Sequence, residues 1–229
     1  MRALCAGLLW LAAILAPGLS WAADRDTTAQ DTDNADALAL LRTAADAGGR
    51  VASLATFFVQ ERRSPMLAKP LLSRGQLCLS RRGAESREND ADDGPDLLWA
   101  YDQPAAPGFL YRRGRALVLE VDDTSRPPQG REQAVTGAIL RLVRQWMRID
   151  PQLIASLYRV ERPDASKPVL RLLPRDTRLF SRIEVTFAPD LASLASLLLE
   201  EANGATLRLT FSGTRINAPL PPRCQALAP

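Results

Sequence analysis

Histidine is absent from all 229 residues, which removes the commonest general base and the commonest zinc ligand. A Ser-His-Asp triad, a Cys-His pair and a HExxH zinc site are therefore excluded. An enzyme would have to use another pair, for example Ser73 as a nucleophile with Lys69 as its base. This pair falls in a predicted loop and strand, without a glycine-rich nucleophile turn or an evident oxyanion site. We therefore expect the protein to be no enzyme and to use no cofactor.

Charged residues do not point to a metal or to a polyanionic partner. Asp92 and Asp93 lie in a charged segment, residues 80–96, where adjacent acids without flanking ligands are typical of a solvated loop. Lys and Arg total 29 against 26 Asp and Glu, and the opposite charges are interspersed. We expect no metal site and no nucleic-acid partner, and this slight excess does not by itself indicate an anionic membrane surface.

Residues 1–22 have the pattern of a secretory signal. Arg2 supplies the positive start, residues 4–16 are apolar, and Ser20-Trp21-Ala22 forms a small-x-small cleavage site. The apolar part is shorter than the ~20 residues that a membrane-spanning helix needs, which disfavours a retained anchor. We expect cleavage after Ala22 and export from the cytoplasm.

Cleavage at this site would leave two cysteines, Cys78 and Cys224. In an oxidising compartment an even pair is consistent with a disulfide, which would tie the Pro-rich tail to an early strand. On the loop-entropy model so long a loop would contribute about 4 to 5 kcal/mol. Two unpaired thiols, one buried in a strand and one in a loose tail, are the alternative.

Three successive predicted strands lie in residues 97–121. Side chains alternate with period two in a strand, so each strand has one face that is apolar and partly aromatic. These faces are formed by Leu97, Trp99 and Tyr101; by Phe109 and Tyr111; and by Leu117, Leu119 and Val121. We expect the three faces to form one large surface on the same side of a sheet, either an ordinary core or a binding surface for an apolar ligand.

The other elements must position this surface. Apolar residues at helical spacing predict an amphipathic helix over residues 36–47, a basic amphipathic helix over 134–149, and a short helix that begins at Asp150-Pro151. Strand patterns occupy residues 51–62, 71–79, 157–161, 168–173, 182–187, 196–201 and 205–212. Asn203-Gly204 indicates a two-residue hairpin between the last two strands.

These elements predict an α+β fold with about nine or ten antiparallel strands, a number at which a sheet normally curls or closes. We expect a single strongly curved antiparallel sheet that forms an incomplete β-barrel, with helices covering its concave apolar face. The domain itself would span residues 35–217. A signal peptide (1–22) and a disordered polar leader (23–34) would precede it, and a Pro-rich tail (218–229) would follow it.

Several short motifs resemble the periplasmic lipoprotein carrier (LolA-like) family in their order and spacing. They are Phe58-Val-Gln60, Lys69-Pro-Leu-Leu-Ser-Arg-Gly75-Gln-Leu77, Trp99-Ala-Tyr-Asp-Gln-Pro104, Leu172-Leu-Pro174, Ile183-Glu-Val-Thr-Phe187 and Glu201-Ala-Asn-Gly204-Ala-Thr-Leu-Arg-Leu-Thr-Phe211, running to Asn217. None is diagnostic alone, but together they cover nearly the whole chain after the signal. The chain looks like a divergent member.

The resemblance implies an unclosed β-barrel with a helical lid, whose cavity receives the acyl chains of a lipoprotein in the periplasm. It also implies a partner on each side, an inner-membrane donor and an outer-membrane acceptor, and we expect the carrier to be a monomer. One motif departs from the pattern. Members of the best-known branch carry an Arg-Pro before the strand tryptophan, whose arginine helps to hold the lid closed, whereas this chain has Asp93-Gly94-Pro95. Arg81, Arg82 and Arg87 are candidates to replace it.

We expect the cavity to be lined by the aromatic strands, their neighbours and the basic helix. The candidate lining residues are Phe58, Leu77, Leu79, Leu97, Trp99, Tyr101, Phe109, Tyr111, Leu117, Leu119, Ile139, Leu142 and Trp146. Ile183, Leu207, Leu209 and Phe211 are assigned instead to a closed core. The sequence does not decide between a lipoprotein, a glycolipid and a polyene or fatty acyl product as the ligand. A less favoured alternative function is an envelope-stress sensor that detects mislocalised lipid.

Overall fold

The structure is a computed structural model, and it describes residues 24–81, 95–103, 108–112, 115–120, 124–129, 150–178 and 180–227. The predicted signal peptide and the predicted helix over 134–149 lie outside these ranges, as does most of the charged segment. Among the described residues, no helix combines the length and the apolar character needed to cross a membrane.

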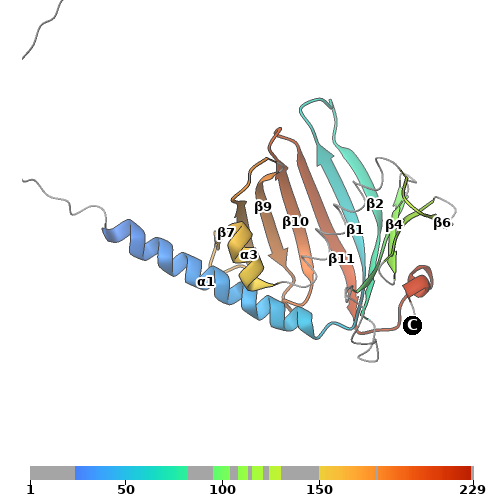
Figure 1. Cartoon of the computed structure of the whole chain (residues 1–229), viewed down its shortest axis with the longest axis horizontal. Helices are drawn as coiled ribbons and strands as arrows, with labels where there is room; N and C mark the ends of the chain where they lie inside the picture. The colour runs from blue at the N-terminus through green and yellow to red at the C-terminus, as the bar shows by residue number, and fades with distance from the viewer. Residues whose placement is uncertain are drawn as a thin grey trace, which may run out of the picture.

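The described chain forms strands with a helix before the first strand and another before the seventh (Figure 1). The elements are α1 (Asp24–Gly49), β1 (Ser53–Arg63), β2 (Leu71–Ser80), β3 (Asp96–Gln103), β4 (Gly108–Arg112), β5 (Arg115–Leu119), β6 (Ser125–Arg126), α3 (Pro151–Leu157), β7 (Tyr158–Glu161), β8 (Val169–Pro174), β9 (Phe180–Phe187), β10 (Leu194–Glu201), β11 (Thr206–Ile216) and the 3-10 helix η1 (Pro222–Leu227).

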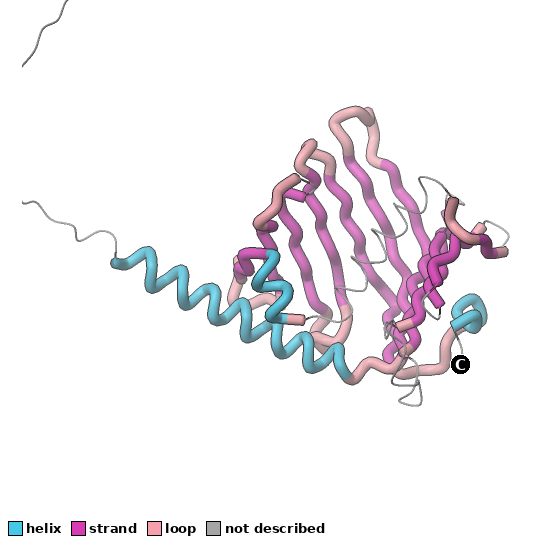
Figure 2. Tube along the Cα trace, viewed as in Figure 1, coloured by secondary structure: helices cyan, strands magenta, loops and turns pink. Residues whose placement is uncertain are grey.

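The strands of the described residues belong to one eleven-stranded sheet in the order β6-β5-β4-β3-β2-β1-β11-β10-β9-β8-β7. Each described pairing is antiparallel. The sheet therefore consists of two sequential meanders joined where β1 pairs with β11. Figures 1 and 2 show the end of the sheet that carries β4 and β6 turned out of the plane of β9, β10 and β11, so the sheet curls. This confirms the predicted α+β fold with an incomplete barrel.

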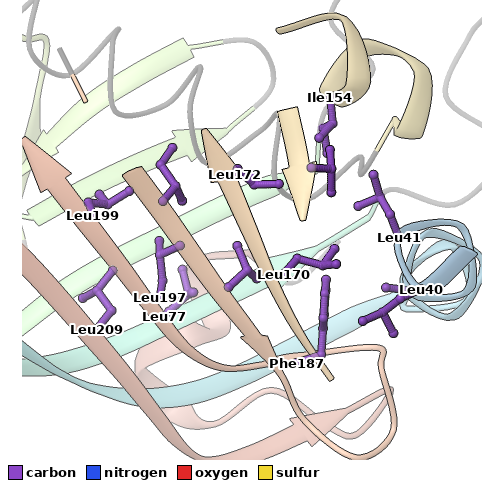
Figure 3. Close-up of a cluster of buried hydrophobic side chains, with 14 of the residues drawn as sticks. Leu40, Leu41, Leu77, Ile154, Leu170, Leu172, Phe187, Leu197, Leu199 and Leu209 are labelled. Carbon is purple, nitrogen blue, oxygen red and sulfur yellow. The ribbon is translucent and has the colours of Figure 1, made fainter. Parts of the chain in front are cut away.

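The concave face of the sheet carries the main core, on which the two helices pack (Figure 3). Alternate residues of β8 and β9, such as Leu170, Leu172 and Ile183, are almost fully buried there. Asp150 caps α3 by accepting hydrogen bonds from the backbone N–H groups of Gln152 and Leu153, and Ile154 then enters the core. The helices thus cover the β7 end of the concave face.

Helix α1 is longer than predicted. Ala37, Leu40, Leu41, Ala44 and Ala47 face the core, whereas Leu38 is only partly buried. The helix begins at Asp24, so residues 24–34, which we expected to form a disordered leader, are helical. Propagating a helix from a docked segment requires no new nucleus, so the helix can extend toward the N-terminus from residues 36–47.

The hairpin between β10 and β11 has a three-residue loop, not the predicted two-residue loop. Gly204 takes a positive φ of 82°, and its backbone N–H donates to Glu201 O at 3.0 Å. The backbone N–H of Glu201 in turn donates to Ala205 O, which closes the loop. The Asn-Gly signal therefore located the turn, and Gly204 takes the left-handed position at the end of the three-residue loop.

The convex face carries a second, smaller core over β2 to β5. It contains Cys78, Leu98, Leu110, Leu119 and Cys224, and η1 packs against it. Cys78 and Cys224 form a disulfide, and both residues are fully buried. Arg223 donates to Tyr101 O and forms an ion pair with Asp102. The segment predicted as a Pro-rich tail is therefore fixed to the outside of the sheet.

Asn217 joins the end of β11 to the segment that links α1 to β1. Its Oδ1 accepts from the backbone N–H groups of Ala52 at 2.7 Å and Ser53 at 3.1 Å, and its Nδ2 donates to Arg50 O at 3.0 Å. The residue has a φ of 52°, a left-handed conformation that asparagine tolerates better than alanine does. This side chain fixes where α1 leaves the sheet.

Replacing Asn217 should therefore destabilise the fold by two separable effects. Asn217→Gly keeps the left-handed backbone but loses three hydrogen bonds, and we expect unfolding free energy to fall by about 1–3 kcal/mol. Asn217→Ala should lose about 1 kcal/mol more because of backbone strain. Urea denaturation followed by circular dichroism measures both variants, and equal stabilities of Asn217→Gly and wild type would contradict this role.

Candidate functional site

An apolar cavity of about 370 Å³ lies against the concave face of the sheet. Most of its lining is aliphatic or aromatic and comes from both meanders. The apolar lining residues are Val51, Leu54, Leu77, Leu79, Trp99, Tyr101, Phe109, Phe180, Phe187, Leu191, Leu194, Leu197, Leu199, Leu207, Leu209 and Phe211. A cavity of this size and composition suits an apolar ligand better than it suits a polar substrate.

A cluster of three aromatic rings supports the cavity wall on β1 and β3. The ring centroid of Phe58 lies 4.6 Å from that of Trp99 and 5.4 Å from that of Tyr101, the latter in a T-shaped contact. Phe58 is itself buried, whereas Trp99 and Tyr101 also line the cavity. A β-carbon added at Gly75 would lie 2.6 Å from the ring of Phe58 and 2.0 Å from Ala100 O. Glycine on β2 thus makes room for the cluster.

Polar atoms of the cluster have few partners. The Tyr101 hydroxyl donates to Gln60 Oε1 at 3.1 Å. Burial raises the pKa of this hydroxyl, and its interactions with Trp99 and Gln60 oppose part of the rise. The indole N–H of Trp99 is buried, and among the described residues no acceptor lies within hydrogen-bonding geometry of it. The cavity wall is therefore apolar in character even where tyrosine and tryptophan form it.

Charged side chains stand at two places on the cavity boundary. Arg62 and Glu201 line it where β1 and β10 end, and their side chains form an ion pair of 2.8 Å. Arg81 lines it where β2 ends, and its Nη1 and Nη2 donate to Gly49 O and Gly48 O at 2.9 and 3.1 Å. Arg81 therefore satisfies two carbonyls at the end of α1, where the helix dipole favours a cation.

Arg81 is the candidate lid-holding arginine that the structure places beside the cavity. Arg82 and Arg87, the other two candidates, lie outside the described residues. The contact of Arg81 joins β2 to the C-terminal end of α1, so it fixes a helix to the sheet at the boundary of the cavity.

Of the residues predicted to line the cavity, the structure brings five to its wall: Leu77, Leu79, Trp99, Tyr101 and Phe109. Phe58, Leu97 and Tyr111 lie in the core on the same face, behind the wall. Ile139, Leu142 and Trp146 fall outside the described residues.

Leu117 and Leu119 are on the other side of the sheet, so their predicted place in the cavity is wrong. Arg112 pairs with Arg115, which puts Leu117 opposite Leu110 and Val118 opposite Phe109. Leu110 and Leu119 are part of the convex core, and Leu117 packs against it. Side chains alternate with period two, so a shift of one residue in register moves a whole strand pattern to the opposite face.

Strands β9, β10 and β11 contribute to the cavity wall in a way that was not predicted from the sequence. Leu207, Leu209 and Phe211, which we assigned to a closed core, line the cavity together with Leu197 and Leu199. The alternation of these residues was visible in the sequence. The pairing of β1 with β11, which brings them onto the same concave face as the residues of β2, was not. A bulge at Gly213, with a φ of 62°, then shifts the phase of β11 so that Thr214 also lines the cavity.

The nucleophile pair considered from sequence is not assembled. Ser73 lies in β2, opposite Gln60, whereas Lys69 is exposed in the turn before that strand. Within the described part of the chain, no hydrogen bond joins the two side chains. This arrangement gives Ser73 no activating base.

Comparisons with known proteins find likeness in fold alone. No family model matches the chain, and no curated protein sequence does either. The structure of MucB matches with a TM-score of 0.50 and 21% identity, over 82% of this chain and 61% of that one. The MucA/MucB complex of Pseudomonas aeruginosa matches with a TM-score of 0.49 and 18% identity, over 85% of this chain and 61% of that one.

A LolA superfamily protein from Nitrosomonas europaea also matches, with a TM-score of 0.36 and 13% identity, over 82% of this chain and 96% of that one. The chain spans about three fifths of the length of the MucB chains that it matches. At such identities these matches describe the architecture and leave the ligand to be argued from the cavity.

Proposed function

We propose that the protein is a periplasmic carrier that holds the acyl chains of a lipoprotein, or of a related lipid, in this cavity and takes them toward the outer membrane. The observation that carries the proposal is the apolar cavity on the concave face. An acyl chain exposed to water costs about 0.8 kcal/mol per methylene, so a lipid needs a container to cross an aqueous space. The secretory signal in residues 1–22 supports the location.

The size of the cavity limits the number of chains. An apolar cavity of about 150 Å³ holds one benzene molecule, so about 370 Å³ has room for roughly 15 carbon atoms. That is one acyl chain. A ligand with two or three chains requires the cavity to widen, and opening and binding are then coupled through the difference in affinity between the two conformations.

Chemical analysis of the natural ligand tests the proposal. The protein is purified from its own periplasm without detergent, and the bound material is extracted and identified by mass spectrometry. Lipoprotein or lipopeptide ions are the expected result. Glycolipid or polyene ions would keep the carrier role and change its ligand, whereas protein recovered repeatedly without any lipid would contradict a carrier.

A matched pair of variants on β11 tests whether the cavity is the binding site. Phe211 lines the cavity, whereas its neighbour Thr210 is exposed on the convex face. We expect Phe211→Glu to weaken binding of a synthetic lipopeptide by about tenfold or more, because burial of a phenylalanine contributes about 1.5–3 kcal/mol and a carboxylate opposes the chain. Thr210→Glu should leave the affinity unchanged.

The fluorescence of Trp99 on titration with the lipopeptide reports this affinity. Circular dichroism of both variants checks that they remain folded. Equal affinities for Phe211→Glu and Thr210→Glu would place the ligand elsewhere.

A further inference from the structure

Exposed apolar side chains are concentrated at the tip of the hairpin between β1 and β2. Met66 is 93% exposed, Leu72 58%, Leu71 54% and Leu67 41%. They lie within seven consecutive residues, around the bends at Pro65 and Pro70. The loop projects beyond the rest of the sheet at the top of Figures 1 and 2. Scattered apolar residues are ordinary on a surface, but four on one projecting loop form a local patch.

The same hairpin has an excess of positive charge. Arg62, Arg63, Lys69 and Arg74 stand on its two arms, with Glu61 as the acidic residue among them. Arg63 is paired with Glu61 at 2.5 Å and Arg62 with Glu201 at 2.8 Å. In the described part of the chain, neither Lys69 nor Arg74 forms an ion pair. The charges of the whole chain nearly balance, but the tip of this hairpin is locally basic as well as apolar.

This tip adjoins the cavity. Arg62 and Glu201, which pair at the base of the hairpin, are also lining residues. Pro65 lies beside the neighbouring β10–β11 loop, since a β-carbon added at Gly204 would be 3.8 Å from Pro65 Cγ. A surface that contacts the tip would therefore be brought close to the end of the cavity bounded by Arg62 and Glu201.

We propose that the β1–β2 hairpin tip docks on a lipid bilayer with anionic headgroups, with Met66 and Leu67 entering the interface and Lys69 and Arg63 contacting the headgroups. Apolar insertion and basic residues are the two signals that together give reversible membrane binding. A protein partner fits less well, because a stable protein interface buries about 800 Å² on each side and a projecting loop of a few residues offers less.

Vesicle binding tests the proposal directly. The mature chain is mixed with sucrose-loaded vesicles of phosphatidylcholine, with or without 30% phosphatidylglycerol (about one anionic lipid in three), and bound protein is measured after sedimentation. We expect binding to the anionic vesicles that weakens at high salt. Met66→Asp with Leu67→Asp should reduce the affinity by about tenfold or more, and Arg63→Gln with Lys69→Gln should reduce it severalfold.

The matched control changes exposed leucines far from the tip. Leu153 and Leu157 on α3 are 45% and 44% exposed, close to the exposure of Leu67. Leu153→Asp with Leu157→Asp should leave vesicle binding unchanged. Wild-type protein that binds neither kind of vesicle, or that binds both equally, would overturn the proposal. Tip variants that bind as wild type would overturn it as well.

Docking and ligand capture are read out separately. Phe211→Glu should lose the lipopeptide and still sediment with anionic vesicles, because Phe211 lies inside the cavity. The tip variant should keep its affinity for the soluble lipopeptide. If the protein does not bind the lipopeptide, the proposed docking surface is therefore unaffected. If the protein does not bind vesicles, the proposed lipid-binding cavity is unaffected.

Discussion

Phe58→Ala should lower the free energy of unfolding by about 3–5 kcal/mol, the usual cost of removing a buried aromatic ring. Phe58 is 1% exposed, and its ring contacts those of Trp99 and Tyr101 on one side and the backbone at Gly75 on the other. Gly75 cannot fill the vacated space because it has no side chain. The hole should therefore persist, and the cost should lie toward the upper end of the range.

The neighbouring phenylalanine is a control of the same chemistry. Phe57 points to the convex face and is 54% exposed, so Phe57→Ala should cost less than about 1 kcal/mol. Urea unfolding curves of the two variants measure the difference. Similar losses for Phe57→Ala and Phe58→Ala would contradict the assignment of the ring cluster as the structural support of the cavity.

Removal of the disulfide is the second large effect. Cys78→Ala with Cys224→Ala should reduce stability by about 2–5 kcal/mol, because the bridge closes a loop between residues 146 apart and restricts the unfolded chain. Most of this loss of stability should arise because the unfolded chain without the disulfide has more conformational freedom. Lipopeptide affinity should fall little when measured at low temperature, since Cys78 is on the convex face and the cavity is on the concave one.

Thermal melting with and without a reducing agent measures this effect. The reduced wild-type protein should melt close to the double variant, and the double variant should not respond to the reducing agent. A wild-type melting temperature that is the same in both conditions would show that the bridge contributes little.

The sequence predicts the strands well because their local patterns carry the information. Leu97, Trp99 and Tyr101 alternate along β3 and lie on its concave face, where Trp99 and Tyr101 line the cavity together with Phe109 of β4. The other face of β3 is buried as well, in the convex core. The pairing of strands is less visible. Leu117 was assigned to the wrong face because nothing in its own pattern fixes the register with β4.

The location of the cavity depends on contacts between distant segments. Leu209 and Phe211 have the pattern of any buried strand, and they line a cavity because β11 pairs with β1 in the middle of the sheet. Asn217 was visible as the end of a motif, but its three hydrogen bonds to residues 50–53 could not be read from spacing. The sequence alone also could not show whether Cys78 and Cys224 form a disulfide or remain free thiols, because their pairing depends on contacts between distant segments.

The pairing of β1 with β11 also has a consequence for the order of folding. Each meander forms through contacts between neighbours in the sequence, but the junction between them requires the first strand, β1, to meet the last, β11. Closing so long a loop is entropically unfavourable, and folds rich in distant contacts form slowly. The cavity is lined from both meanders, so neither half-sheet can enclose a ligand before β11 arrives. The cavity should therefore form late in folding, and the disulfide between Cys78 and Cys224 should then stabilise the completed sheet.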